Sequence, residues 1–107
     1  ETLLWVAQRA SAAVLAVCVT VHLATMIYAV RGGLTAAEIL ARTQGSLAWL
    51  AFYTVFVLAV VVHAPIGLRA LLGEWLGWRG RSRDAALLAF AALLAWAGMR
   101  AVFGVFR

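Results

Sequence analysis

Residues 46–72, SLAWLAFYTVFVLAVVVHAPIGLRALL, form a nearly unbroken apolar segment. An α-helix rises about 1.5 Å per residue, so roughly 20 such residues cross the hydrocarbon core of a bilayer. The segment is longer than that, and we predict a membrane-spanning helix that tilts or protrudes at one end. Near its end it contains two polar residues, His63 and Arg69, separated by Pro65 and Gly67.

Two more apolar segments, at about 8–30 and 85–106, are also long enough to cross a bilayer. We therefore predict an all-α integral membrane protein with three transmembrane helices in one domain, residues 1–107. The first segment is too long for the core of a typical signal peptide and lacks an obvious cleavage site, so we expect it to be retained. Because the sequence opens with Glu1 rather than Met, we also expect further residues upstream.

The composition excludes a soluble domain. Hydrophobic residues make up 66% of the 107 residues and charged residues 12%, so the chain cannot bury its apolar surface around a water-soluble core. The net charge is +5, but the basic residues lie at segment ends rather than on one face of a soluble module, which argues against nucleic-acid binding. The single cysteine, Cys18, has no redox or zinc-binding spacing and is expected to be a buried apolar residue.

The arginines predict the orientation in the membrane. One side would carry Arg9, Arg69, Arg79, Arg81 and Arg83. The other would carry Arg31, Arg42 and Arg107. Because basic residues favour the cytoplasmic side, we expect the N-terminus and the loop from Trp75 to Arg83 in the cytoplasm. The C-terminus would then lie outside. The first loop, 31–45, contains Thr35-Ala-Ala-Glu38, a pattern typical of a capping box at the start of a short surface helix.

His63 and His22 are the strongest candidates for chemistry inside the membrane. Ionisable side chains are costly there and usually face the protein interior or a functional site. A neutral imidazole is a natural axial ligand of haem iron, but it also forms hydrogen bonds between helices without a cofactor. His63 lies about 9 Å and His22 about 20 Å from the edge defined by Arg69 and Arg9. Since imidazole–metal bonds are about 2 Å long, we expect that the two do not share one iron. If either histidine binds iron, its second ligand must come from a partner subunit or a second copy of the chain.

Other residues near His63 also suit a cofactor. Pro65 removes one backbone hydrogen bond and Gly67 permits the close approach of a flat group, although both also fit an ordinary kinked span. Arg69 and Arg100 are candidates to hold haem propionates. The alternatives are that Arg69 anchors its helix at the lipid headgroups and that Arg100 pairs with a neighbouring helix.

Three polar residues, Gln8, Arg9 and Ser11, open the first span. A quinone headgroup requires hydrogen-bond donors directed at its carbonyl oxygens in an apolar slot, and these side chains supply such donors. The alternative is that Arg9 extends to lipid phosphate, as arginines at helix ends commonly do. Both interpretations remain open on the residues alone.

The pattern His63-x-x-x-Gly67-x-Arg69, preceded by Arg9-x-Ser11 on the first span, resembles the cytochrome b membrane-anchor subunits of succinate dehydrogenase and fumarate reductase. The resemblance covers nearly the whole chain. It implies that His63 is an axial ligand of haem b and that Arg9 and Ser11 contribute to a quinone site.

The first span also departs from the common pattern of that family. Gln8 and Trp5 stand where many members have His and Ser. His22 resembles the first-span ligand of two-haem members, in which one haem lies near each membrane face. The resemblance therefore implies one haem b at His63 and leaves open a second one at His22.

The resemblance implies a haem b-binding membrane-anchor subunit of succinate:quinone oxidoreductase, or of its fumarate-reducing relative, in a bacterial inner membrane. The chain has no flavin fingerprint and no cysteine set for iron–sulfur clusters. Flavoprotein and iron–sulfur subunits on the cytoplasmic face are thus the implied partners. A second membrane-anchor subunit would supply the missing haem ligand and complete a four-helix cage, and electrons would pass to ubiquinone or menaquinone.

Three alternatives remain. The chain is a haem-free structural subunit of a membrane complex, a transport subunit, or the haem b anchor of a different dehydrogenase. No carboxylate lies inside the three predicted spans, which argues against a proton-driven transporter with an acidic relay.

Overall fold

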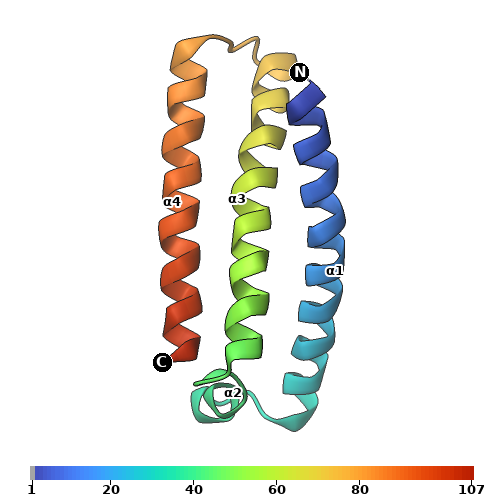
Figure 1. The fold of residues 1–107 in the computed structure, drawn as a ribbon, viewed down its shortest axis with the longest axis vertical. Helices are drawn as coiled ribbons and strands as arrows, with labels where there is room; N and C mark the ends of the chain where they lie inside the picture. The colour runs from blue at the N-terminus through green and yellow to red at the C-terminus, as the bar shows by residue number, and fades with distance from the viewer. Residues whose placement is uncertain (1) are drawn as a thin grey trace.

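The computed structural model describes residues 2–107, which form four helices: α1 (Thr2–Gly32), α2 (Ala36–Thr43), α3 (Leu47–Trp75) and α4 (Arg81–Phe106). The three long helices run up and down side by side, and α2 lies across the end where α1 leads into α3 (Figure 1). Each long helix is long and apolar enough to cross a membrane. The prediction of an all-α membrane protein with three transmembrane helices is confirmed.

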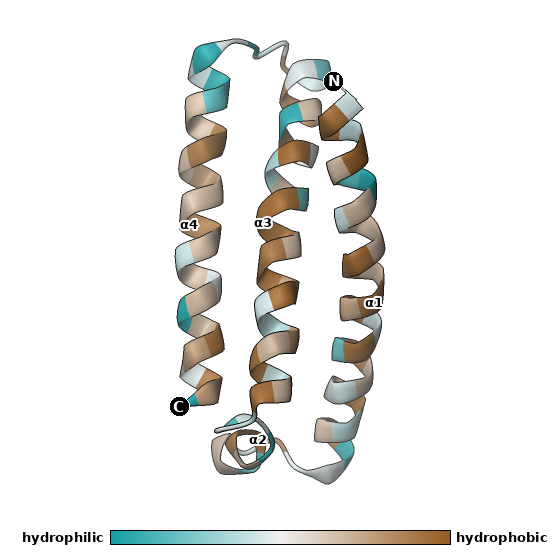
Figure 2. Cartoon of the chain, viewed as in Figure 1, coloured by the Kyte–Doolittle hydropathy of each residue, from teal (hydrophilic) through white to brown (hydrophobic). Residues whose placement is uncertain are grey.

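The long helices extend beyond the predicted spans. α1 begins at Thr2 rather than near residue 8, α3 ends at Trp75 rather than Leu72, and α4 begins at Arg81 rather than Ala85. Hydropathy marks only the hydrocarbon core, whereas helical hydrogen bonding continues through the thicker headgroup region. Figure 2 shows more polar ends where α3 leads into α4, whereas the rest of both helices is largely apolar.

The less exposed residues of α1 recur every three or four positions, which is the spacing of one helical face. They are Leu4, Ala7, Gln8, Ser11, Leu15, Cys18, His22, Thr25 and Ala29. α1 packs against α3, so this stripe directs several polar side chains of α1 into the protein. Cys18 is buried within it, as expected.

α3 lies between the other two long helices and packs against both. Its contact with α4 is tight at Gly98. A Cβ atom placed on Gly98 would lie 2.7 Å from Cγ1 of Val57. Small residues permit such approaches between helices in lipid, where close packing replaces the hydrophobic effect as the attractive force.

The first loop forms the expected short helix. The hydroxyl of Thr35 accepts a hydrogen bond from the backbone N–H of Glu38 at 3.2 Å, which confirms the predicted N-cap. The Glu38 carboxylate lies against the backbone of Gly33, whose φ is +136°. A side chain at Gly33 would both collide with Glu38 and strain the backbone.

The last residue of α2 and the two residues after it cap the end of α4. The Thr43 hydroxyl donates to the carbonyl oxygen of Val105 at 2.8 Å, and the Gly45 N–H donates to that of Phe106 at 2.7 Å. The Gln44 side-chain amide donates to the carbonyl oxygen of Arg107. The last carbonyl groups of a helix have no partner within it, so this loop supplies the donors that the end of α4 lacks.

Replacing Thr43 by valine removes one of these donors without changing the size of the side chain much. An unpaired backbone carbonyl costs about 1–3 kcal/mol, so we expect the thermal midpoint of the purified protein complex to fall. Thr20→Val is the matched control because the Thr20 hydroxyl bonds only to the carbonyl oxygen of Ala16 in its own helix. Equal midpoints for the two variants would show that the cap of α4 does not contribute to stability.

Candidate functional site

His63 lies opposite Ser11 in the contact between α3 and α1. The Nδ1 atom of His63 is 3.4 Å from the Oγ atom of Ser11. Ser11 is only 6% exposed, and its hydroxyl also lies 3.1 Å from the main-chain carbonyl oxygen of Gln8. The imidazole is therefore held from one side by α1.

Gly67, one turn after His63, brings the two helices close together. A Cβ atom at Gly67 would lie 3.3 Å from Nε2 of Gln8. The group nearest to Gly67 is thus the Gln8 amide, whose Oε1 atom is buried without a hydrogen-bond partner. Pro65 lies within this segment, and α3 continues through it to Trp75.

Arg9 lies on another face of α1. Its guanidinium stacks over the Trp5 ring, 5.1 Å from the ring centroid, and its side chain is exposed. Successive residues of an α-helix are about 100° apart, so Arg9 and Ser11 project in nearly opposite directions. The structure brings Gln8 and Ser11 to His63 and leaves Arg9 on the outer face.

Arg69 approaches the start of α4. Its Nε atom lies 3.8 Å from Oδ1 of Asp84, which also accepts a hydrogen bond from Nε of Arg83 at 3.2 Å. Arg83 is 8% exposed, and Asp84 occupies the first turn of α4, where a negative charge is favourable. Arg69 thus links α3 to α4 at the membrane end that also holds the N-terminus (Figure 1).

Arg100 faces outward from α4. Its guanidinium lies over the Trp96 ring at 5.4 Å from the centroid, and Trp96 is 61% exposed. A propionate or a neighbouring helix that pairs with Arg100 must therefore approach this outer face of α4.

His22 lies nearer the opposite membrane end, among aromatic side chains of α3. Its ring meets Tyr53 and Phe56 edge-on, with centroids 6.1 Å and 5.7 Å apart. Phe56 precedes His63 by seven residues, which is about 10 Å along a helix. This placement agrees with the expectation that His22 and His63 do not share one iron.

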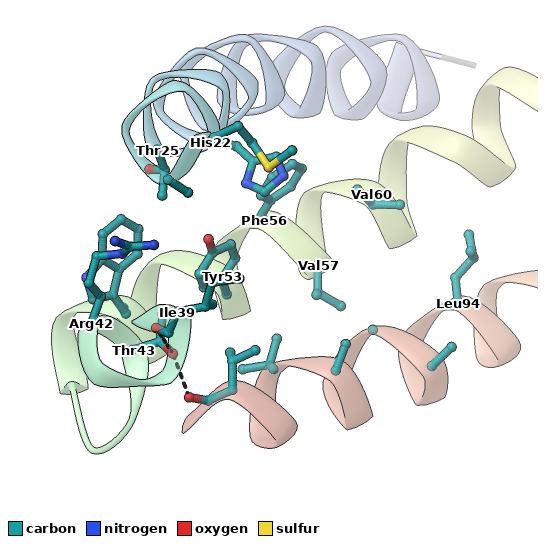
Figure 3. Close-up of a pocket in the computed structure, with 18 of the residues that line it drawn as sticks. His22, Thr25, Ile39, Arg42, Thr43, Tyr53, Phe56, Val57, Val60 and Leu94 are labelled. Carbon is teal, nitrogen blue, oxygen red and sulfur yellow. Dashed lines mark hydrogen bonds between the residues drawn. The ribbon is translucent and has the colours of Figure 1, made fainter. Parts of the chain in front are cut away.

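A cavity of about 560 Å³ lies beside His22. α1, α3 and α4 form its sides, α2 covers its end, and most of its lining is apolar (Figure 3). The polar groups at its edge include Arg42, Thr25 and Tyr53. The Nδ1 atom of His22 is buried without a hydrogen-bond partner. The volume of the cavity falls within the range of about 300–1,000 Å³ that is typical of ligand sites.

The model of a family described as succinate dehydrogenase/fumarate reductase transmembrane subunit matches residues 1–102. The chain belongs to this family. A search of curated proteins found no match, and neither did a search of solved structures. The family resemblance expected from His63, Gly67 and Arg69 with Arg9 and Ser11 is thereby confirmed. The transmembrane subunit is a multi-pass membrane protein that forms part of a complex with several subunits.

The transmembrane subunit has two separate polar sites within its spans. Two buried side-chain polar atoms among residues 2–107 lack a hydrogen-bond partner, Oε1 of Gln8 and Nδ1 of His22. An unpaired buried polar atom costs about 1–3 kcal/mol, and such atoms often mark places where a ligand or partner belongs. One of them lies near His63 and the other beside the cavity.

Sequence reasoning missed two features of the transmembrane subunit. It assigned Ser11 to a quinone and did not anticipate its contact with His63. It also overlooked the aromatic side chains near His22, which recur along α3 at positions 49, 52, 53 and 56. That spacing of three or four residues is a signal of one helical face.

Proposed function

We propose that this transmembrane subunit is the haem b-binding membrane anchor of a succinate:quinone oxidoreductase, with His63 as an axial ligand. Membership of the family supports the anchor role. The observation that carries the haem proposal is the His63 imidazole, held against buried Ser11 between two membrane-spanning helices.

The residues present fit a haem. Among residues 2–107, no three His, Cys, Asp or Glu side chains gather in a way that would hold a metal ion. A haem brings four porphyrin nitrogens, so it requires only one imidazole from this chain and one from a partner. Haem b, when bound, would supply one-electron transfer. Arg69, six residues after His63, would hold a propionate while remaining close to Asp84, and Arg100 is the second candidate for that role.

A quinone site beside the start of α1 is the second part of the proposal. The Gln8 amide lies in the contact between α1 and α3, and the Arg9 guanidinium lies on the adjoining outer face. A headgroup of ubiquinone or menaquinone that enters from the lipid would meet both donors. Ser11 lies deeper, next to His63.

The orientation and the partners follow from the charged ends. The N-terminus and the loop between α3 and α4 lie at the same end of the molecule (Figure 1), and five of the nine arginines belong to this end: Arg9, Arg69, Arg79, Arg81 and Arg83. We place this end in the cytoplasm of a bacterium, following the excess of basic residues. Flavoprotein and iron–sulfur subunits would dock there, and a second anchor subunit would supply the other haem ligand.

The cavity beside His22 supports a second haem b near the opposite face. The lining is mostly apolar, and Arg42 is the cation among the lining residues that would pair with a propionate. His22 lines this cavity, so its imidazole would be the iron ligand that this chain supplies.

An optical difference spectrum, reduced minus oxidised, tests the proposal on the purified complex. We expect b-type absorbance bands that appear on addition of succinate. Absence of these bands would indicate that the chain is a haem-free structural or transport subunit. Bands that respond to another electron donor but not to succinate or fumarate would indicate the anchor of a different dehydrogenase.

The quinone site is tested by Arg9→Ala and Gln8→Ala. A hydrogen bond to a charged group contributes about 1.5–3 kcal/mol, so we expect Arg9→Ala to raise the KM for quinone by roughly ten- to a hundredfold. Gln8→Ala should raise it less because its amide is neutral. Arg31→Ala, at the other end of the same helix, is the control. An unchanged KM in Arg9→Ala and Gln8→Ala would place the quinone elsewhere.

A further inference from the structure

The hydroxyl of Ser11 has one proton and two possible partners. Its Oγ atom lies 3.1 Å from the carbonyl oxygen of Gln8 and 3.4 Å from Nδ1 of His63. A carbonyl oxygen only accepts hydrogen bonds. The contact with Gln8 therefore uses the proton of the hydroxyl, as is common for serine and the carbonyl three residues earlier in a helix.

This count of protons determines the tautomer of His63. The Ser11 oxygen has only lone pairs left for the contact with Nδ1, so Nδ1 must be the donor. A neutral imidazole that carries its proton on Nδ1 has a free lone pair on Nε2. Nε2 of His63 is not among the buried polar atoms without a partner, so it is not sealed within this chain.

We propose that Ser11 is a positioning residue for His63: it fixes the Nδ1–H tautomer and the ring orientation, and so presents the Nε2 lone pair to the haem iron. This inference rests on the proposed haem site at His63. Histidines that bind metals almost always donate their other ring N–H to a fixed acceptor, and loss of that acceptor typically lowers metal affinity by about 10- to 100-fold.

The burial of Ser11 favours this role over direct contact with a quinone. Its side chain is only 6% exposed, and its single proton is already engaged with the Gln8 carbonyl. It has no proton left to donate to a quinone oxygen. Arg9 and the Gln8 side chain have donors that are not used in this way.

The test compares Ser11→Thr with Ser11→Val in the whole complex. The two replacement side chains have nearly the same shape, but only threonine keeps the hydroxyl, so any effect of crowding is shared. We expect haem to pass to excess apomyoglobin about 10- to 100-fold faster from the Ser11→Val complex than from the Ser11→Thr complex. The reduction potential of the haem should also be higher in Ser11→Val, because an imidazole without an acceptor donates less electron density to iron.

Other results would overturn the proposal. Equal rates of haem loss and equal potentials in the two variants would show that the hydroxyl does not position His63. A KM for quinone that rises in Ser11→Val alone, with unchanged haem properties, would assign Ser11 to the quinone instead. Failure of the underlying haem assignment is a separate result, because the wild-type complex would then lack b-type bands or His63→Ala would retain them.

Discussion

His63→Ala is expected to abolish binding of the haem b that we propose at this residue. Under this proposal the variant would keep a single protein ligand to the iron, supplied by the partner subunit. The loss of affinity should exceed the roughly 10- to 100-fold that removal of an outer hydrogen-bond partner costs. The ratio of haem to protein in the purified complex, together with the difference spectrum, measures the effect. Full retention of haem in His63→Ala would show that the axial ligand lies elsewhere.

His22→Ala is the companion variant. The two imidazoles belong to different sites, since His22 contacts Tyr53 and Phe56 whereas His63 contacts Ser11. If the complex holds two haems, each substitution should remove one. If His22→Ala leaves the haem content of the wild type, then one haem is present and the cavity beside His22 serves another purpose.

The second large effect is expected at the contact between α3 and α4. Gly98→Ala places a methyl group 2.7 Å from Cγ1 and 3.0 Å from Cγ2 of Val57, closer than carbon atoms normally approach. The helices must separate or Val57 must change its rotamer, and overpacking of this kind costs about 1–3 kcal/mol. The thermal midpoint of the complex should fall accordingly.

Gly104→Ala is the matched control, because nothing lies within 4 Å of a Cβ atom at Gly104. Both substitutions gain the same intrinsic helix propensity on α4, so the difference between them measures the clash. Adding Val57→Ala to Gly98→Ala should recover part of the loss. If Gly98→Ala and Gly104→Ala have the same midpoint, the close contact at Gly98 is not important for stability.

The sequence predicts the number and the approximate places of the membrane helices because lipid requires about 20 apolar residues per span. It also predicts α2, since Thr35 and Glu38 stand at the spacing of a cap. The helix ends are less predictable, because the polar residues beyond each span remain helical in the headgroup region.

The pairing of side chains between helices is much harder to predict. Long helices that are apolar on nearly every face give little indication of their rotation, so the contact of Ser11 with His63 is not visible in the sequence. The divergence of Arg9 from Ser11 does follow from helical geometry, since two residues correspond to about 200° of rotation. The pairing of Arg69 with Asp84 depends on how the intervening loop folds.

The cap on α4 has a consequence for the order of assembly. Thr43 and its acceptor on α4 are 62 residues apart in the chain, so residues 43–45 cannot form these hydrogen bonds until α4 has been synthesised and inserted. Until then, the Gln44 amide and the Gly45 N–H lack these acceptors, whereas the Thr43 hydroxyl still has the carbonyl oxygen of Ile39 at 3.3 Å. The hydrogen bonds between residues 43–45 and the end of α4 therefore form late. They fix the position of α4 along the bundle axis relative to α2.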